Sequence, residues 1–383
     1  MRAVARVNVA AIERNVARLR EPLAPGTALC AVVKADGYGH GAVAVARAAL
    51  AGGARWLAVV TAGEATALRR AGIDARLLVM GPLTDGELEE ALDAGAEVVA
   101  WEEEGVARLL ERGRPAAVHL KLDSGMGRLG QRDPQLALRL ADRITSAGHL
   151  RLSGLMTHFA TADDREDDFF DRQLERFSTW VEQVRREHPD VVVHAANSAA
   201  ILRDPASHFD LVRPGVAIYG MDPFGRDPDE QRLEPVLEWR SRLVSVKPAE
   251  PGDSVGYGRR YVAERATRIG NVPVGYADGV RRGLTGRGAE VLVAGRRVPF
   301  AGTVSMDSIG IDLGPEGEGP PARVDDPVLV LGRDGDERIT AEEIAALLDT
   351  INYEITCGIG ARVVRRYHRD GVPVGGDEAD PGL

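Results

Sequence analysis

Residues 76–101, RLLVMGPLTDGELEEALDAGAEVVAW, contain the pattern that decides the fold. An apolar run at Arg76–Met80 is followed by a segment of helical character, Gly86–Ala94, and then by a second apolar run, Glu97–Trp101. Strands that are apolar on both faces, each followed by a helix, are typical of a parallel sheet covered by helices on both sides. This stretch therefore predicts a β–α–β unit.

The same alternation of strand and helix candidates continues in both directions along the chain. Eight strand candidates in roughly 190 residues predict an α/β fold of the closed (β/α)8 TIM-barrel type rather than an open doubly wound sheet. Gly37, Gly39 and Gly41 lack the G-x-G-x-x-G spacing, so a dinucleotide-binding fold is the weaker interpretation. The other strand candidates are Leu29–Val33, Trp56–Val60, Ala117–Leu122, Leu152–Thr157, Val191–Ala196 and Asp210–Arg213, and the other helix candidates are Gly41–Ala51, Glu64–Ala71 and Gln135–Ser146.

The chain after residue 220 has a different pattern. The segment Met221–Pro235 is rich in proline, glycine and charge, which indicates a domain boundary. After it, short strands alternate with turns, and one helix candidate begins at Thr340, which has the capping-box spacing with Glu343. A tail with few apolar residues is expected to be disordered. The expected units are a barrel domain at residues 1–232, a mainly β C-terminal domain at 233–368 and a disordered tail at 369–383.

Composition excludes several classes of function. The net charge of −10, from 48 basic and 58 acidic residues, speaks against a nucleic-acid-binding protein. The two cysteines, Cys30 and Cys357, indicate neither a disulfide framework nor a Cys-rich metal site. No signal-peptide core or apolar run of membrane length occurs, so we expect a cytoplasmic protein without membrane contact.

Lys34, in AVVKADGYGHG, is the first candidate for chemistry, because it ends an apolar strand and precedes a glycine-rich turn. The C-terminal ends of barrel strands line the active site. Apolar surroundings favour the neutral form of an amine, and a neutral amine can form a Schiff base. Taken alone, Lys34 could equally be a solvated lysine at a strand end.

Three further residues lie at or near the ends of the fifth and sixth strand candidates. Arg128 sits in the glycine-rich loop of KLDSGMGRLG, and its planar guanidinium suits a carboxylate or a phenolate. Lys121 precedes it within the strand, where a lysine that points into a barrel would need a compensating anion. His158, in THFA, could by itself be a structural histidine.

The ends of the seventh and eighth strands predict a phosphate site. Asn197 and Ser198 begin a helix, and Arg213 is followed by Gly215 and Val216. Barrel phosphate sites are often built from the loops after strands seven and eight together with a helix N-terminus. The hydroxyl of Ser198 and the amides of the two later residues fit that plan.

The second domain adds residues that are weak signals singly: Tyr257 in VGYGRRY, Tyr276 in VPVGYADG, Met306 in VSMDSIG and Tyr353 in INYEITCG. Together with the barrel motifs they resemble the alanine racemase family closely, from about residue 4 to residue 367. That family combines a pyridoxal-phosphate barrel with a β-rich C-terminal domain. The motifs, in order, are AVVKADGYGHG, KLDSGMGRLG, THFA, NSAA, VRPGVAIYG, GYADG, VSMD and INYEI.

The resemblance implies an isomerase that uses pyridoxal 5'-phosphate to interconvert L-alanine and D-alanine and so supplies D-alanine for peptidoglycan. It also implies a homodimer with shared active sites, in which Lys34 carries the cofactor and is one base, while Tyr257 from the second subunit is the other. The resemblance further implies that five residues hold the phosphate: Tyr38, Ser198, Gly215, Val216 and Tyr353. Arg213 would face the pyridine nitrogen, with His158 between it and Tyr257, and Arg128 would contact the phenolate and the substrate carboxylate. Met306 from the partner would lie beside that carboxylate, Tyr276 would line the substrate entry, and Lys121 would be a carbamylated lysine.

Three alternatives remain at this point. A racemase or decarboxylase of the same architecture could act on serine, lysine or ornithine, which the volume around Tyr257, Met306 and Tyr353 would decide. A protein that carries pyridoxal phosphate without turnover would resemble the barrel alone, so the large second domain speaks against it. A metal-dependent barrel hydrolase is disfavoured because no His-x-His pair stands at a strand end, and we expect no metal.

Overall fold

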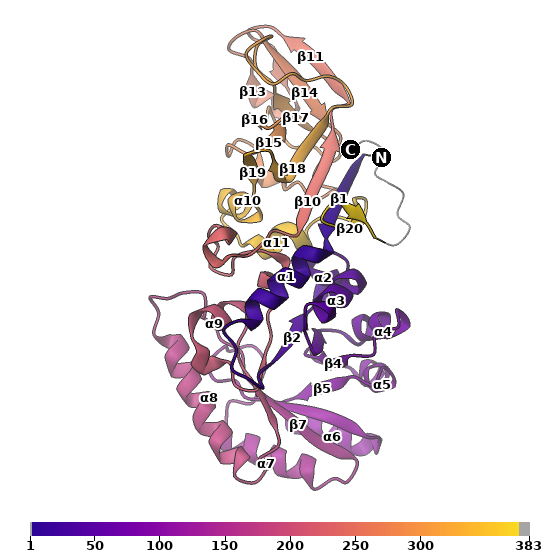
Figure 1. Cartoon of the computed structure of the whole chain (residues 1–383), viewed down its shortest axis with the longest axis vertical. Coiled ribbons are helices and arrows are strands. Elements are labelled where there is room, and N and C mark those ends of the chain that lie inside the picture. Colours follow the sequence, from indigo (N-terminus) through magenta and orange to yellow (C-terminus); the bar gives the residue numbers. More distant parts are fainter. Residues whose placement is uncertain (1, 375–383) are drawn as a thin grey trace.

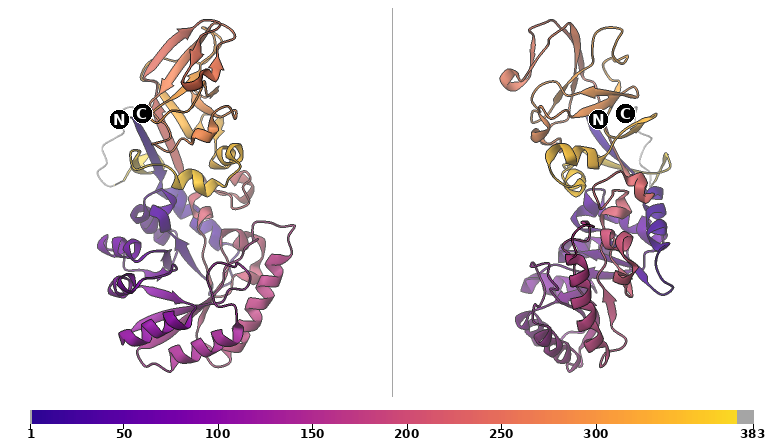
Figure 2. Two further views of the ribbon diagram at one scale, coloured as in Figure 1. Left: turned by 180° about the vertical axis from the view of Figure 1, so that it is seen from behind. Right: turned by 90° about the vertical axis from the view of Figure 1, so that its left-hand side faces the viewer.

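The computed structural model describes residues 2–374. The chain forms two parts that follow each other along the long axis of the molecule (Figure 1). Alternating strands and helices make up the lower part in Figure 1, and the upper part consists mainly of strands. The views from behind and from the side show the same division (Figure 2). Within the described residues, no helix combines the length and the apolar character needed to cross a membrane.

Eight parallel strands form the barrel in the order β9-β2-β3-β4-β5-β6-β7-β8. Between β8 and β9, the backbone N–H of Asp210 donates to the carbonyl of Val193 over 3.1 Å, and that of Arg213 donates to Ala196 over 2.8 Å. These bonds close the ring, so the predicted (β/α)8 barrel is confirmed, and each predicted strand overlaps an observed one. The strands are β2 (Ala28–Val32), β3 (Trp56–Val59), β4 (Arg76–Val79), β5 (Glu97–Ala100), β6 (Ala116–Lys121), β7 (Leu150–Met156), β8 (Val192–His194) and β9 (Leu211–Val212).

Helices surround the barrel, and side chains at their first residues fix where they begin. Thr61 and Glu64 form a capping box at α4, and Thr84 and Glu87 form another at α5. Each of the four predicted barrel helices overlaps an observed helix, with ends that differ by at most two residues. The helices are α1 (Val9–Arg20), α2 (Lys34–Tyr38), α3 (Ala42–Ala51), α4 (Ala62–Arg70), α5 (Asp85–Asp93), α6 (Glu103–Arg112), α7 (Pro134–Thr145), α8 (Phe169–Arg185) and α9 (Ser198–Arg203), with short 3-10 turns η1 (Pro205–Ser207), η2 (Val216–Tyr219) and η3 (Pro228–Gln231).

The second part is mainly β, as predicted, and contains three sheets. The largest has the order β16-β15-β18-β10-β1-β20-β21, with β19 paired to β18. Its strands are β1 (Ala3–Asn8), β10 (Leu237–Arg242), β15 (Glu290–Val293), β16 (Arg296–Pro299), β18 (Pro327–Asp334), β19 (Glu337–Ile339), β20 (Val364–Arg369) and β21 (Val372–Pro373). The other elements are β11 (Ser245–Ala249), β14 (Thr267–Val272) and β17 (Ile309–Asp312) in a second sheet, β12 (Ser254–Val255) and β13 (Tyr261–Val262) in a third, α10 (Ala341–Leu348), α11 (Asn352–Cys357), η4 (Tyr257–Arg259) and η5 (Arg282–Leu284).

The first strand differs from the expectation that the barrel domain starts at residue 1. β1 pairs antiparallel with β10 and parallel with β20, so it is an inner strand of the second part's large sheet. Figure 1 shows it in the upper part, running from the N-terminus down to α1. Val4 and Val7 are fully buried there. The physical reason is that this inner position gives both edges of the strand backbone hydrogen-bond partners while its valines are buried.

The expected disordered tail from residue 369 is also corrected over residues 369–374. β20 and β21 form a hairpin, with Arg369 opposite Val372. Arg369 donates to both carboxylate oxygens of Glu13 over 2.6 Å each, and Asp370 accepts from Asn8 over 3.0 Å. Polar contacts rather than apolar burial order this segment. The rest of the predicted tail, 375–383, lies outside the described residues.

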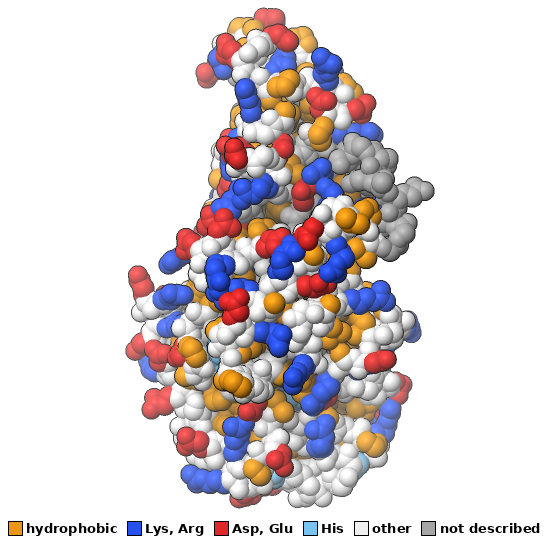
Figure 3. Space-filling model, viewed as in Figure 1, with side chains coloured by type: hydrophobic (Ala, Val, Ile, Leu, Met, Phe, Trp, Pro, Cys, Tyr) orange, Lys and Arg blue, Asp and Glu red, His pale blue; other side chains and the backbone are white. Residues whose placement is uncertain are grey.

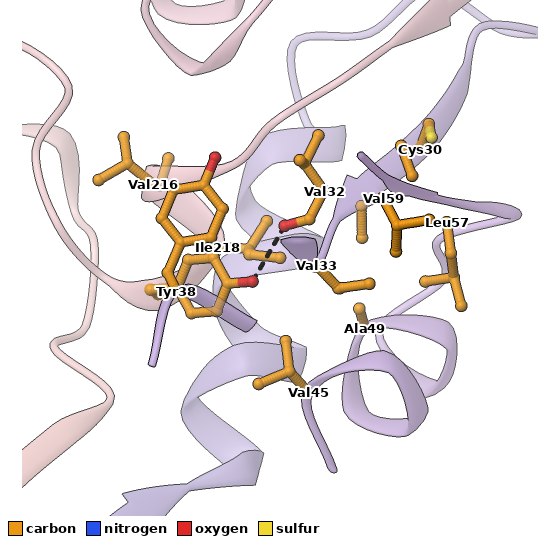
Figure 4. Packing of buried hydrophobic residues seen from close by; sticks show 14 of the residues in the cluster. Cys30, Val32, Val33, Tyr38, Val45, Ala49, Leu57, Val59, Val216 and Ile218 are labelled. Atoms are coloured by element: carbon orange, nitrogen blue, oxygen red, sulfur yellow. Dashed lines mark hydrogen bonds between the residues drawn. The ribbon is translucent and has the colours of Figure 1, made fainter. Parts of the chain in front are cut away.

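The barrel core reaches the C-terminal ends of the strands through a cluster of aromatic and aliphatic residues (Figure 4). Tyr38 and Tyr219 stack with ring centroids 4.7 Å apart, and the hydroxyl of Tyr219 donates to the carbonyl of Val32 over 2.9 Å. Figure 4 shows Val216 and Ile218 in the same cluster. On the molecular face drawn in Figure 3, positive and negative side chains are interspersed.

Candidate active site

A cavity of about 610 Å³ lies at the C-terminal ends of the barrel strands, where β2, β6, β7, β8 and β9 end. Tyr353 and Cys357 of α11 extend its wall from the second part of the chain. The structure therefore brings together eleven residues that the sequence analysis singled out. They are Lys34, Tyr38, Lys121, Arg128, His158, Asn197, Ser198, Arg213, Gly215, Val216 and Tyr353.

Lys34 stands at the start of a tight turn that directly follows β2. Ala35, Asp36 and Gly37 all have left-handed backbone angles, with φ of 52°, 51° and 61°. Non-glycine residues adopt this conformation at a cost of about 1–2 kcal/mol each, so other contacts must hold it. One of them is the bond from the N–H of Ala35 to Oε1 of Glu64, 2.6 Å long. The lysine is thus fixed at the mouth of the barrel.

The cavity wall is cationic. Lys34, Lys121, Arg128 and Arg213 line it, and within residues 2–374 no acidic side chain does. Burial, followed by repulsion from Arg128, lowers the pKa of Lys34. Burial, followed by repulsion from Arg213 and Arg128, lowers the pKa of Lys121 to about 8. Such a site favours neutral amines and anionic ligands.

The hydroxyl of Ser198 is hydrogen-bonded to the loop after β9. The Ser198 hydroxyl oxygen accepts from the N–H of Gly215 over 2.9 Å and from that of Ala217 over 3.3 Å. Among the described residues no acceptor takes the hydrogen of this hydroxyl, which can therefore donate into the cavity. Asn197 caps α9 by accepting from the N–H of Ala200 over 2.9 Å. Its contact with a ligand stays a prediction.

Tyr38 lies close to Gly215 of this loop, since a Cβ on Gly215 would be 2.3 Å from its phenol oxygen. It is buried, and its ring centroid is 5.9 Å from that of Tyr353. Burial raises the pKa of both phenols, so both are neutral hydrogen-bond donors near neutral pH. Tyr38, Tyr353 and Ser198 thus line one cavity together with the loop after β9.

Arg213 is held by neutral acceptors only. Its guanidinium donates to the carbonyls of Thr157 and Ala195 over 2.8 and 3.0 Å, and to Nδ1 of His194 over 2.9 Å. A longer contact of 3.3 Å joins it to Nδ1 of His158. Burial lowers the pKa of Arg213 to about 10, so the group still carries its charge at neutral pH. Burial, followed by the charge of Arg213, keeps the pKa of His158 well below its usual value.

Tyr257, Tyr276 and Met306 are not brought into the cavity of their own chain. They are exposed on the second part, with 75%, 43% and 52% of their surface accessible. Their segments are adjacent, since the N–H of Tyr276 donates to the carbonyl of Ser305 over 3.0 Å and Thr303 donates to the carbonyl of Tyr257 over 2.7 Å. Their expected contribution to a second subunit's site stays a prediction.

Two features of the site were missed by the sequence analysis. Cys357 lines the cavity one helical turn after Tyr353, a spacing that INYEITC does contain. Two buried histidines, His119 and His194, stand behind Arg213. Their signal is a polar residue inside otherwise apolar strands, in VHLKL and VVVHAA.

Comparison with known proteins agrees with this geometry. The family model for the N-terminal domain of alanine racemase matches residues 7–223, and that for the C-terminal domain matches residues 236–367. The chain is 41% identical over 369 residues to alanine racemase from Symbiobacterium thermophilum, covering 95% of this chain and 96% of that protein. It is 42% identical over 373 residues to alanine racemase from Thermobifida fusca, covering 95% and 98%.

Solved structures give the same result. The crystal structure of alanine racemase from D-cycloserine-producing Streptomyces lavendulae superposes with a TM-score of 0.89 at 38% identity, covering 96% of this chain and 97% of that one. The Bacillus anthracis alanine racemase, solved with bound L-Ala-P, has a TM-score of 0.89 at 37% identity, covering 98% and 97%. The chain therefore belongs to the alanine racemase family of isomerases.

Proposed function

We propose that this chain interconverts L-alanine and D-alanine with pyridoxal 5'-phosphate, in the cytoplasm, and supplies D-alanine for peptidoglycan. We further propose a homodimer in which Lys34 of one subunit and Tyr257 of the partner subunit act as bases on opposite faces of the substrate. The observation that carries the proposal is the cation-lined cavity at the barrel mouth, with a half-buried lysine of lowered pKa in its wall.

The donor set fits the cofactor and the substrate. A phosphate ester and an amino-acid carboxylate are both anions, and the cavity offers four cationic side chains without an acidic one among the described residues. Ser198 and the amides near Gly215 would hold the phosphate, together with Tyr38 and Tyr353. Arg128 would bind the substrate carboxylate, because its planar fork matches two carboxylate oxygens. Arg213 would face the pyridine nitrogen.

Lys34 is suited to proton transfer by its surroundings. The lowered pKa means that a larger fraction of its Nζ is neutral and able to take a proton at ordinary pH. When bound here, pyridoxal phosphate supplies an electron sink for charge that develops at the substrate α-carbon. Nζ would take or return the α-proton on one face only, because the turn after β2 holds it on one side of the cavity.

Inversion needs a second base on the other face. A tyrosine hydroxyl has an ordinary pKa near 10, so positive charge must help it ionise. Arg213 can only donate, so Nδ1 of His158 accepts and Nε2 of this neutral ring carries the hydrogen. That N–H would donate to the phenol oxygen of Tyr257 of the partner subunit and stabilise its ionised form. Tyr276 and Met306 of the partner subunit would border the substrate.

Lys121 fits the role of a carbamylated lysine. With a pKa of about 8, part of its amine is neutral near neutral pH. A neutral amine can add to carbon dioxide, forming an N–C bond and releasing one proton. The resulting carbamate would place a negative charge beside Arg128 and Arg213, where the described residues provide no carboxylate in the cavity wall.

The decisive experiment incubates the purified protein and pyridoxal phosphate with single L-amino acids and separates the products on a chiral column. We expect D-alanine from L-alanine at a higher kcat/KM than any D-product from serine, lysine or ornithine. Absence of D-alanine, or faster inversion of one of the other three, would contradict the proposal. Growth of a D-alanine-requiring bacterial strain carrying this gene, without added D-alanine, tests the peptidoglycan role.

A further inference from the structure

A row of buried side chains leads from Arg213 through the barrel interior. Nη1 of Arg213 is 2.9 Å from Nδ1 of His194, and Nε2 of His194 is 2.7 Å from Nδ1 of His119. Nε2 of His119 is in turn 3.0 Å from Oε2 of Glu97. Both histidines are fully buried. Glu97 is the first residue of β5, so the row ends at the barrel end opposite to the cavity.

The donors and acceptors in this row can have only one direction. A guanidinium only donates, so Nδ1 of His194 must be unprotonated. In a neutral ring the hydrogen is then on Nε2, which donates to Nδ1 of His119. His119 consequently carries its own hydrogen on Nε2 and donates it to the carboxylate of Glu97. Burial lowers the pKa of both histidines, in agreement with neutral rings.

The barrel provides room for this arrangement. Gly154 of β7 is opposite His119 of β6 in the sheet register. A Cβ on Gly154 would lie 2.2 Å from Nδ1 of His119, closer than real Cβ contacts. Any side chain at this position would push the imidazole away from its partner. The glycine is therefore needed for the hydrogen bond between the two rings.

Glu97 is built to be an ionised acceptor. Ser153 donates to Oε2 over 2.5 Å, and Arg76 donates from Nε to Oε1 over 2.7 Å. Burial disfavours the charged carboxylate, but the hydrogen bonds from His119, Ser153 and Arg76 outweigh it and lower the pKa of Glu97 below its usual range. The far end of the row is thus anionic and the Arg213 end cationic.

We propose that Glu97 is a positioning residue for the reaction, because its carboxylate fixes the tautomers of His119 and His194 and thereby holds the guanidinium of Arg213 in the cavity wall. Within residues 2–374 no carboxylate pairs with Arg213 directly. Glu97 acts in place of such a partner, through two neutral rings. The inference rests on the proposed function, in which Arg213 faces the cofactor.

The opposite tautomer would break the row at its functional end. If His119 carried its hydrogen on Nδ1, His194 would accept at Nε2 and carry its own hydrogen on Nδ1. That N–H would face the donating guanidinium of Arg213. Two donors facing each other in a buried site are strongly unfavourable, so Arg213 would have to move.

The test compares Glu97→Gln with Arg76→Lys in the holoenzyme labelled with 15N-histidine. In Glu97→Gln the amide oxygen is expected to face the cationic Arg76, which turns the NH2 group toward His119. Arg76→Lys changes the same barrel end but leaves the carboxylate in place. In the wild type and in Arg76→Lys, we expect 15N shifts of neutral rings protonated at Nε2 for His119 and His194. In Glu97→Gln, both rings should move to the Nδ1-protonated form.

The kinetic readout is the kcat for alanine. We expect Glu97→Gln to lower kcat about tenfold, the fold-change that corresponds to about 1.4 kcal/mol, and to leave KM within about twofold. The reason is that Arg213 faces the cofactor and not the substrate carboxylate. Arg76→Lys should keep kcat within about twofold of the wild type. The visible absorbance of the bound cofactor should shift in Glu97→Gln only.

Several results would overturn the inference. One is a wild type in which His119 or His194 is protonated at Nδ1 or at both nitrogens. Another is a Glu97→Gln variant in which both rings are protonated at Nδ1 but kcat is unchanged. A third is an equal loss of kcat in Glu97→Gln and Arg76→Lys. If Glu97→Gln does not fold, Gly154→Ala displaces the His119 ring while the carboxylate stays, and the same loss of kcat is expected. A wild type that does not invert alanine would refute the proposed function, whereas the 15N shifts and the absorbance would still decide the role of Glu97.

Discussion

Gly215 and Tyr38 pack closely against each other in the cavity wall, so that a Cβ on Gly215 would lie 2.3 Å from the Tyr38 phenol oxygen. The Gly215→Ala substitution must therefore displace the phenol, which is stacked on Tyr219. We expect the Kd for pyridoxal phosphate to rise about tenfold, the equivalent of losing one good hydrogen bond to the phosphate. Fluorescence titration of the cofactor-free protein measures this change.

A matched control for that change is Gly63→Ala. Gly63 lies in α4, and a Cβ there meets nothing within 4 Å. Replacing a helical glycine by alanine should stabilise the fold by about 0.5–1 kcal/mol and leave cofactor affinity unchanged. Wild-type affinity in Gly215→Ala would show that the loop after β9 is not a phosphate site.

Lys34 can be tested unusually cleanly because the chain contains only three lysines, Lys34, Lys121 and Lys247. We predict that Lys34→Ala abolishes the visible absorbance of the bound cofactor, whereas Lys247→Ala, at an exposed position of β11, leaves it intact. After borohydride reduction of the wild type, peptide mapping should find the cofactor on Lys34. Recovery of the label on either of the other two lysines would be incompatible with the proposed site.

Sharing of the active site between subunits predicts complementation between two inactive variants. Lys34→Ala lacks one base and Tyr257→Phe lacks the other, so each homodimer should be nearly inactive in both directions. In a hybrid dimer, one of the two sites contains Lys34 and Tyr257 from different subunits and is intact. Random re-pairing of equal amounts should restore about a quarter of the wild-type activity.

The same mixture also tests the alternative that Tyr257 acts within its own chain. If Tyr257 acted within its own chain, every site in a hybrid dimer would lack one base and mixing would restore nothing. Activity should be followed while the dimers exchange, with unmixed samples kept under identical conditions. A mixture that stays inactive after proven exchange would exclude a shared site.

The pH dependence of stability should reveal Lys121. Its folded-state pKa is lowered to about 8 from 10.5, mainly by burial. Between these values the unfolded chain binds a proton that the folded chain lacks, so stability rises with pH across this window. Below pH 8 the fold bears the full cost of the buried charge. Lys121→Met removes this titration.

We therefore expect Lys121→Met to be more stable than the wild type at pH 7, and the difference in Tm to shrink as the pH rises toward 10. The measurement belongs in carbonate-free buffer, since a carbamate would replace the buried cation by an anion. A difference in Tm that does not vary with pH would contradict a lowered pKa for Lys121.

Local patterns in the sequence were sufficient to predict the barrel and much of the site. The strand and helix periods gave all eight strands, and Thr340 does cap α10 by accepting from the N–H of Glu343 over 3.1 Å. The residues at strand ends, such as Lys34 and His158, converge because parallel strands end at one rim. These features depend on neighbours close in sequence or on the barrel's symmetry.

Other features depend on partners that no local pattern specifies. The apolar pattern of β1 fits both the barrel and the large sheet of the second part, and its neighbours in that sheet lie far along the chain. The hairpin after Arg369 is ordered by contacts such as the one to Glu13, which composition alone does not predict. The tautomers of His119 follow from the three-dimensional neighbours of its two ring nitrogens. The proposed site shared with a second chain is visible in this chain only as exposed residues, among them Tyr257.

The place of β1 between β10 and β20 has a consequence for synthesis on the ribosome. β1 is translated before both of its neighbours, and one of them, β20, follows β10 and every strand of the barrel. The barrel strands all emerge before β10, so the barrel of the nascent chain can fold while both edges of β1 are still unpaired. Chains released early, before Val364, would keep one edge of β1 open to pairing with other molecules. Protection of the first strand by ribosome-bound chaperones would then matter more for this protein than for barrels whose first strand is used at once.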